Sequence, residues 1–375
     1  MPDGKRGESL QIGERGERIA FFDNLRGVLI LWVVIGHLVA NVSPYTHSRL
    51  LVAVFDWVWT FHIPTFVFIS GLFAKGMLKK GKRFPLERVL TFFLLFLSMG
   101  VLLYLMQAAL SGSPVTIKLL SNVLITKKAH WYLLAMALYT LSVPLLARVK
   151  ASAALAFTFI VAISWGLWVN DALFLSLGRV LTFAPFFVCA FYLKASRVKK
   201  LKEALANFEF YKRIGMFLIA VLIPMVLFLI LYHGAYTYSK TIYALCGATQ
   251  TYAALATQLH GSIAAPLLAR VVYYPVVGAM ILCLLVLVPL ARLPFLNRAG
   301  EASLQIYILH VFIYYAMGGL GINEMMMKQL HLWVISPFVF APIIVYLLSL
   351  PRSPMRGYRV LTDWCKHMFL NHQKQ

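Results

Sequence analysis

Long hydrophobic runs separated by short polar segments dominate the pattern of this chain. A helix needs about 20 mostly apolar residues to cross the hydrocarbon core of a bilayer. The runs predict ten transmembrane helices, over residues 20–41, 51–74, 88–109, 130–147, 152–169, 178–194, 213–232, 268–290, 302–320 and 332–350. We therefore expect an all-α polytopic membrane protein, a bundle of about ten transmembrane helices.

The segment from 234 to 267 does not continue this pattern. Within it, residues 241–262 are less apolar and include Gln250, Gln258 and His260. We interpret this stretch as part of a long loop. A re-entrant segment or an extra span is the alternative.

Composition supports a membrane location. Of the 375 residues, 61% are hydrophobic and 13% are charged, whereas soluble domains are about 45–50% apolar and about 25% charged. The surplus apolar surface must therefore face lipid.

The formal net charge of +22 comes from short basic blocks between the apolar runs. With the N-terminus in the cytoplasm, most Lys and Arg residues fall on the inner side, which is the positive-inside pattern. This predicts cytoplasmic termini, with a segment over 1–18, a membrane domain over 19–350 and a basic tail over 351–375. The blocks suit anionic membrane lipids, so we expect no nucleic-acid partner.

Several function classes lack their motifs. The four cysteines lack the spacing of a zinc site or a disulfide, so we expect no metal. No cleavable signal peptide is evident. Without a Walker A loop, HExxH or GxSxG, an ATP-driven pump, a metalloprotease and a serine hydrolase lose support.

The first run carries three ionisable residues, Asp23, Arg26 and His37. Such groups are costly at membrane depth and are functional candidates by default. At about 100° per residue, Arg26 and His37 share one helix face, about 16 Å apart along the axis. Asp23 lies one turn before Arg26, where an ion pair would lower the cost of burial. A snorkelling pair at the interface is the alternative reading.

The second run contains His62 near its middle, with Pro64, which should kink the helix, and Ser70 further on. Small residues such as Ser70 also allow close helix contact, which is the plain structural reading.

The ninth run contains Ser303, Tyr307 and His310, and Arg179 opens the sixth. Tyr307 and His310 face the same side. Histidines on three spans suit proton transfer near neutral pH, although a lone histidine in an apolar helix is usually a packed, hydrogen-bonded residue.

Residues 22–27 (FDNLRG), followed by His37, resemble the start of the acyltransferase-3 family of membrane O-acyltransferases, whose first span carries an Arg, ten residues and a His. Residues 61–71 and 300–310 are similar to two later signatures of that family. Residues 131–134 and 179–187 also fit, most closely the branch resembling fucose 4-O-acetylases. Asn24, where a Gly is common, is a departure from the pattern.

The resemblance implies a cytoplasmic acyl-CoA donor, commonly acetyl-CoA, and a carbohydrate or cell-envelope glycan acceptor on the outer side. The protein itself would then lie in the cell membrane, that is, the plasma or inner membrane. Arg26, with the basic segment from Lys79 to Arg88, would bind donor phosphates. His37 would act as general base or as covalent acyl carrier. His62, His310 and Ser303 would position the acceptor or donate to the oxyanion. The further substrate-binding candidates are Asp23, Ser70, Arg179 and Tyr307.

Two other functions explain buried histidines and arginines. A secondary transporter or flippase of glycan-linked substrates is the first, although we find no inverted repeat and no matching pair of broken helices. A non-enzymatic partner of a polysaccharide synthase is the second, and there the histidines would be structural.

Overall fold

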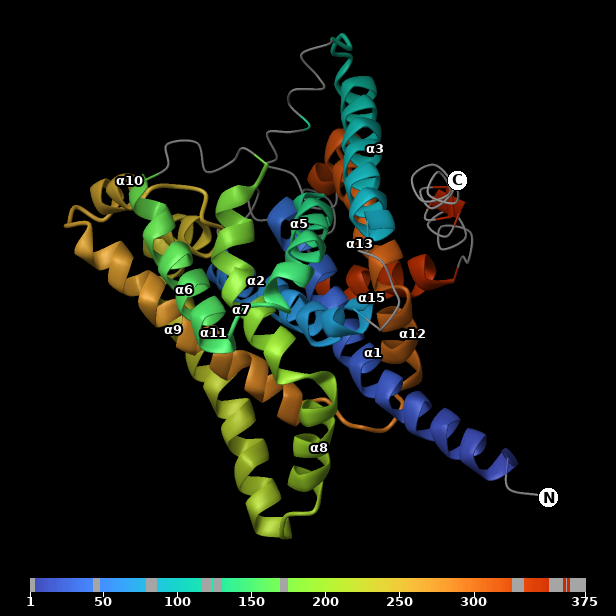
Figure 1. Ribbon diagram of the computed structural model, residues 1–375. Coiled ribbons are helices and arrows are strands. Elements are labelled where there is room, and N and C mark those ends of the chain that lie inside the picture. The colour runs from blue at the N-terminus through green and yellow to red at the C-terminus, as the bar shows by residue number, and fades with distance from the viewer. Residues whose placement is uncertain are drawn as a thin grey trace.

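The computed structural model describes residues 4–42, 48–78, 86–116, 123, 130–168, 175–325, 334–350, 360–361 and 363–364, with side chains from residue 20 onward except those of 42 and 168. Throughout these ranges the regular structure is helical (Figure 1). The elements are α1 (Gly4–Val42), α2 (Arg49–Ala74), η2 (Lys75–Leu78), α3 (Leu86–Ser111), α5 (Trp131–Leu146), α6 (Ala151–Trp168), α7 (Leu177–Leu193), α8 (Ala195–Ala206), α9 (Phe210–Gly247), α10 (Tyr252–Gln258), α11 (Ala264–Leu287), α12 (Pro294–Glu301), α13 (Ser303–Gly319) and α15 (Ser336–Ser349).

Five of the described helices are long and apolar enough to cross a membrane: α1 from Ala20, α2 with η2, α3, α9 and α11. Counting the bent pair α7–α8 as one span makes six. The chain is a multi-pass membrane protein. The other predicted spans coincide with shorter helices, such as α5, whose 16 residues extend about 24 Å, less than the hydrocarbon core. The total of ten and the cytoplasmic placement of the termini stay predictions, and residues 332–333 lie outside the described ranges.

The predicted loop over 241–262 is wrong for much of its length. Helix α9 has 38 residues and continues to Gly247, and α10 follows from Tyr252. Gln250, Gln258 and His260, which suggested a loop, all lie after α9, whereas a polar residue in the second half of α9 faces a buried partner. The Ser239 hydroxyl donates to the buried Asp56 carboxylate over 2.9 Å.

Helices α8 and α12 were not predicted, because each is short and amphipathic and neither contains a long apolar run. Helix α8 bends away from α7 by 78° after Lys194, whose φ is +66°. It is anchored by Lys202, whose Nζ donates to the carbonyl of Val286 over 2.6 Å. That carbonyl lies in the last turn of α11, where the helix dipole favours a cation.

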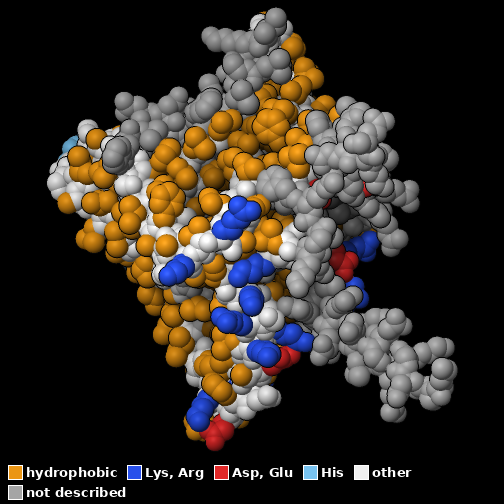
Figure 2. Space-filling view, viewed as in Figure 1, with side chains coloured by type: hydrophobic (Ala, Val, Ile, Leu, Met, Phe, Trp, Pro, Cys, Tyr) orange, Lys and Arg blue, Asp and Glu red, His pale blue; other side chains and the backbone are white. Residues whose placement is uncertain are grey.

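Basic residues gather at one end of the bundle, which we call the basic end. Lys75 lies over the ring of Tyr192, at 5.1 Å. The Tyr192 hydroxyl in turn donates to the carbonyls of Leu146 and Val149, beside Lys150. Figure 2 shows Lys and Arg side chains over α8 and the neighbouring helix ends, whereas hydrophobic side chains cover most of the remaining described surface on this face. A lipid-facing belt next to a charged rim has this distribution.

Helix α2 occupies the middle of the bundle and packs against α1, α7, α9 and α11 (Figure 1). Pro64 lies inside it and removes the backbone donor that would bond the carbonyl of Thr60. The buried Tyr273 hydroxyl of α11 donates to that carbonyl over 3.3 Å. A neighbouring helix thus satisfies the group that the proline frees, as membrane helices require.

Helices α1 and α12 approach each other at two glycines. A Cβ added to Gly27 would overlap the carbonyl oxygen of Leu296, and one added to Gly300 would overlap the carbonyl oxygen of Asp23. Small residues at such crossings allow backbones to touch. The turn of α1 that carries Asp23 and Arg26 is therefore fixed by backbone contact with α12.

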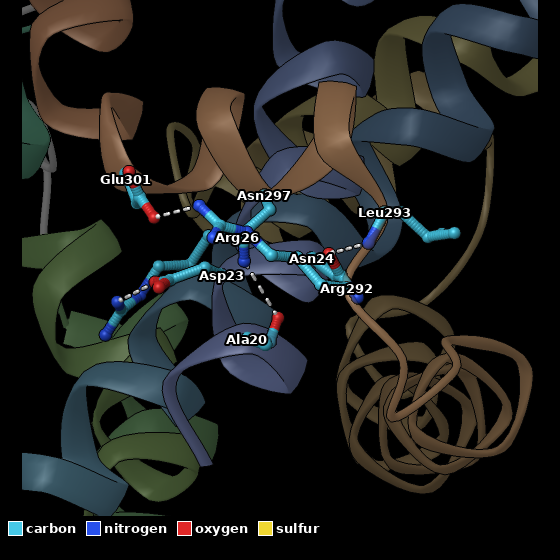
Figure 3. Close-up of polar contacts among 8 residues, drawn as sticks. All are labelled: Ala20, Asp23, Asn24, Arg26, Arg292, Leu293, Asn297 and Glu301. Carbon is cyan, nitrogen blue, oxygen red and sulfur yellow. Dashed lines mark hydrogen bonds and ion pairs between the residues drawn. The ribbon is translucent and has the colours of Figure 1, made fainter. Parts of the chain in front are cut away.

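Asn24 reinforces the same contact (Figure 3). Its amide nitrogen donates to the carbonyl of Ala291 over 2.7 Å, and its amide oxygen accepts from the backbone N–H of Leu293 over 3.2 Å. Within the segment that leads into α12, Nε of Arg292 donates to Oδ1 of Asn297 over 2.8 Å. The asparagine that departs from the family pattern therefore ties α1 to the segment leading into α12.

We expect Gly300→Ala to lower the free energy of unfolding by about 1–3 kcal/mol, because the added methyl group must displace backbone. Gly278→Ala in α11 is the matched control, since a Cβ there meets nothing within 4 Å. It should be neutral or stabilising by up to about 1 kcal/mol through helix propensity. Unfolding in detergent measures both, and equal stability of the two variants would contradict the backbone contact.

Candidate active site

Three helices bring three histidines together. The ring centre of His37 on α1 lies 5.0 Å from that of His310 on α13. The Trp59 ring connects His37 to His62 on α2, at 5.4 Å from the first and 5.2 Å from the second. Residues far apart in sequence therefore form one imidazole cluster inside the bundle.

Two of these histidines are buried and hydrogen-bonded to backbone. Nδ1 of His62 lies 2.6 Å from the carbonyl oxygen of Val58, and Nδ1 of His310 lies 2.8 Å from that of Ile306. A carbonyl only accepts, so Nδ1 carries the hydrogen and Nε2 of each neutral ring keeps its lone pair. Among the described residues, Nε2 of His310 has no hydrogen-bond partner.

His37 differs from the other two. It makes no hydrogen bond to the described residues and is only half-buried. It lines a cavity of about 190 Å³, which we call the histidine cavity, together with Trp59, His62 and Tyr314. Of the three imidazoles, His37 is therefore the most exposed, and it lines this cavity together with His62.

Arg179 in the first turn of α7 lines the same cavity. Its side chain is buried, and its guanidinium lies 5.1 Å from the ring centre of Trp131. The Tyr243 hydroxyl of α9 is within hydrogen-bonding reach. The cavity thus has a permanent cation in one wall.

A second cavity, of about 240 Å³, lies beside Arg26, and we call it the arginine cavity. Arg26 pairs with Asp23 over 3.0 Å, as the sequence spacing predicts (Figure 3), and lies over the ring of Phe73. Ser70 and Tyr132 also line this cavity, with their hydroxyl oxygens 3.3 Å apart.

Val33, Ile63 and Tyr307 line both cavities and form the wall between them. On α1 the order along one face is Arg26, Val33, His37, which is the face that the helical period predicts. The two cavities therefore adjoin, with the guanidinium of Arg26 in one and the imidazole of His37 in the other.

The predicted site residues divide between these cavities. The histidine cavity contains His37, His62, Arg179 and Tyr307, with His310 packed against His37; the arginine cavity contains Arg26, Ser70, Ser303 and Tyr307, with Asp23 as counter-ion of Arg26. Ser303 lines the arginine cavity and not the histidine cavity, and its role in positioning the acceptor or donating to the oxyanion stays a prediction. Of the basic segment from Lys79 to Arg88, residues 79–85 lie outside the described ranges.

Sequence reasoning missed Trp59, Tyr243 and Tyr314. The ring of Tyr314 lies 5.4 Å from that of His37. Its position four residues after His310, on the same face of α13, could have revealed it. Tyr243 carried no such signal, because it falls in the segment that we predicted as a loop.

Among the described residues, no group of three His, Cys, Asp or Glu side chains is placed to hold a metal ion. Comparison with protein families matches an acyltransferase domain over residues 19–351, nearly the whole chain. The chain belongs to the acyltransferase-3 family. It is accordingly a membrane acyltransferase of this family, and the closer likeness to fucose 4-O-acetylases stays a prediction. No curated protein and no solved structure matches the chain.

We predict that His37→Ala lowers the rate of acyl transfer by about 10²–10⁴-fold, the usual contribution of a general base. His233→Ala is the matched control, because His233 is exposed on α9 and outside both cavities. Turnover of the purified variants in detergent measures the effect. Near-normal turnover of the His37 variant, with intact folding, would exclude the role.

Proposed function

We propose that this acyltransferase moves an acyl group, in the first instance acetyl, from cytoplasmic acyl-CoA to a hydroxyl of an extracytoplasmic carbohydrate. The plasma or inner membrane is the proposed location, with the basic end in the cytoplasm. The observation that carries the proposal is the pair of adjoining cavities, because it offers one compartment for each substrate and a single wall at which they can meet.

The arginine cavity suits the donor. It lies next to the turn that carries Asp23 and Arg26, where the α12 contact also places Arg292. Guanidinium groups pair with phosphate oxygens in bidentate fashion. The nucleotide end of acyl-CoA would remain at the basic end, with its pantetheine arm in the cavity and its thioester at the wall.

The histidine cavity suits the acceptor hydroxyl. Its volume of about 190 Å³ is below that of typical ligand pockets, so only a small part of a glycan fits beside His37. In the proposed reaction the His37 imidazole takes the hydroxyl proton while the oxygen attacks the thioester carbonyl carbon. The carbon–sulfur bond then breaks, and the CoA thiolate takes the proton from the imidazolium.

The hydrogen-bond pattern assigns supporting roles. His62 and His310 already use Nδ1–H on backbone carbonyls, so in their neutral form they can accept hydrogen bonds but not donate one to an oxyanion. Because Nε2 of His310 is unpartnered among the described residues and the ring adjoins His37, His310 is suited to hold His37 in orientation. The Tyr314 hydroxyl is a suitable donor to the developing negative charge.

Transfer of label in detergent tests the proposal directly. Purified protein receives acetyl-CoA labelled in the acetyl group and a glycan extract from envelopes of cells carrying His37→Ala. We expect labelled glycan and an equal amount of free CoA thiol. A transporter or flippase would yield neither, since detergent leaves no compartments to connect. Label bound to the protein when the glycan is omitted would indicate a covalent acyl-His37 intermediate instead of direct transfer.

We also predict that a donor analogue shields the arginine cavity and not the histidine cavity. Desulfo-coenzyme A, which has no thiol, should slow maleimide labelling of the thiol introduced by Ser70→Cys about tenfold at about ten times its Kd, by mass action. The native Cys246 lines the histidine cavity and is the internal control. Peptide mass spectrometry reads both sites. Protection of Cys246 alone would reverse the assignment of the cavities.

A further inference from the structure

The positive charge of Arg179 lacks a carboxylate partner among the described residues. The side chain is 7% exposed and its described neighbours, Trp131 and Tyr243, are uncharged. A buried guanidinium in a lipid-embedded bundle is costly unless an anion accompanies it. The described side chains therefore supply no anion for this cation.

The other buried charged groups of the described bundle do not supply this anion. Arg26 has its own counter-ion in Asp23 at 3.0 Å. The buried Asp56 accepts from Ser239 at 2.9 Å and, among the described residues, forms no ion pair with an arginine. Among the described residues, charge pairing thus neutralises Arg26 and leaves two buried arginines, Arg179 and Arg270, without a carboxylate partner. Of these two, Arg179 is the one that lines the histidine cavity.

Two local features offset part of the cost without removing the charge. The α9 helix ends at Gly247, where a Cβ would lie 3.8 Å from Nε of Arg179. A helix C-terminus carries about half a negative charge, and the face of Trp131 adds a cation–π contact. Both are weaker than an ion pair, so Arg179 can stay charged and still attract an anion.

The position of Arg179 in the histidine cavity indicates which molecule would supply the anion. Arg179 and His37 line the same small cavity, so a group held by the guanidinium lies close to the hydroxyl that His37 would deprotonate. We infer that the acceptor is an anionic glycan, whose carboxylate or phosphate, on the acylated sugar or its neighbour, binds Arg179. This inference rests on the proposed function and narrows its acceptor class.

A carboxylate and a phosphate present the same paired oxygens to a guanidinium, so the test separates the two sources. The glycan extract from His37→Ala cells is divided into three portions: untreated, carboxyl-reduced with carbodiimide and borohydride, and dephosphorylated with aqueous hydrofluoric acid. Each portion is then the acceptor in the labelled acetyl-CoA assay. We expect one of the two treatments to lower kcat/KM by roughly tenfold to a hundredfold, the usual worth of a charge-assisted hydrogen-bonded pair.

Variants show whether Arg179 reads the anion. Arg179→Gln should raise the KM for the untreated glycan to about the value that the wild type shows for the treated portion with lowered kcat/KM. Arg179→Lys should give a KM between those of the wild type and Arg179→Gln. Tyr314→Phe should lower turnover on every portion alike. Arg49→Gln, at the exposed start of α2, is the charge-removal control and should match the wild type. Asp171 lies outside the described residues, and Asp171→Asn should also match the wild type. If Asp171→Asn instead has the same phenotype as Arg179→Gln, Asp171 is the counter-ion of Arg179 and the inference is overturned.

The outcomes keep the two hypotheses apart. If the untreated glycan is acylated and neither treatment changes kcat/KM, the acyltransferase function stands and the anionic acceptor is excluded. If Arg179→Gln lowers kcat equally on all portions, Arg179 serves the oxyanion and the inference fails. If the untreated glycan is not acylated, the proposed function fails and the inference fails with it.

Discussion

The need to satisfy every polar group inside an apolar bundle governs this molecule. Hydrocarbon offers no hydrogen bonds, so each buried charge or backbone group must find a partner within the protein. The carbonyl freed by Pro64 receives the Tyr273 hydroxyl, Asp23 neutralises Arg26, and two histidines bond backbone carbonyls. Among the described residues His37, Arg179 and Arg270 have neither a carboxylate partner nor a backbone hydrogen bond, and of these three His37 and Arg179 line the same cavity.

Rigid contacts fix the helices α1 and α2, which carry His37 and the wall between the cavities. Helix α1 carries Arg26, Val33 and His37 on one face, and its turn at Asp23 is held by backbone contact with α12 and by Asn24. Helix α2 supplies His62 and Ile63 from the middle of the bundle. A chemical site inside a membrane protein needs such fixed walls, because a displacement of about 1 Å can cost a hundredfold in rate.

Two adjoining cavities give a simple physical basis for the proposed transfer from a cytoplasmic donor to an extracytoplasmic acceptor. Neither cavity exceeds about 240 Å³, less than a typical ligand pocket. Each substrate can therefore insert only its reacting end, while its charged or bulky part stays outside. Val33, Ile63 and Tyr307 line both cavities. In the proposed reaction the two substrate ends meet at these side chains, which would limit the water that could hydrolyse the donor.

The sequence alone determined the membrane class, the all-helical fold and many of the polar residues that line the two cavities, because hydropathy and titratable groups in apolar runs are local properties of the chain. The helical period likewise put Arg26 and His37 on one face and paired Asp23 with Arg26. Only the tertiary structure decided that α9 continues through the segment taken for a loop and that α8 and α12 exist. It also placed Ser303 apart from His37 and brought Tyr243 and Tyr314 to the cavity. These outcomes depend on which helix face meets which neighbour, and polar residues that look like a loop in sequence become helical once a buried partner satisfies them.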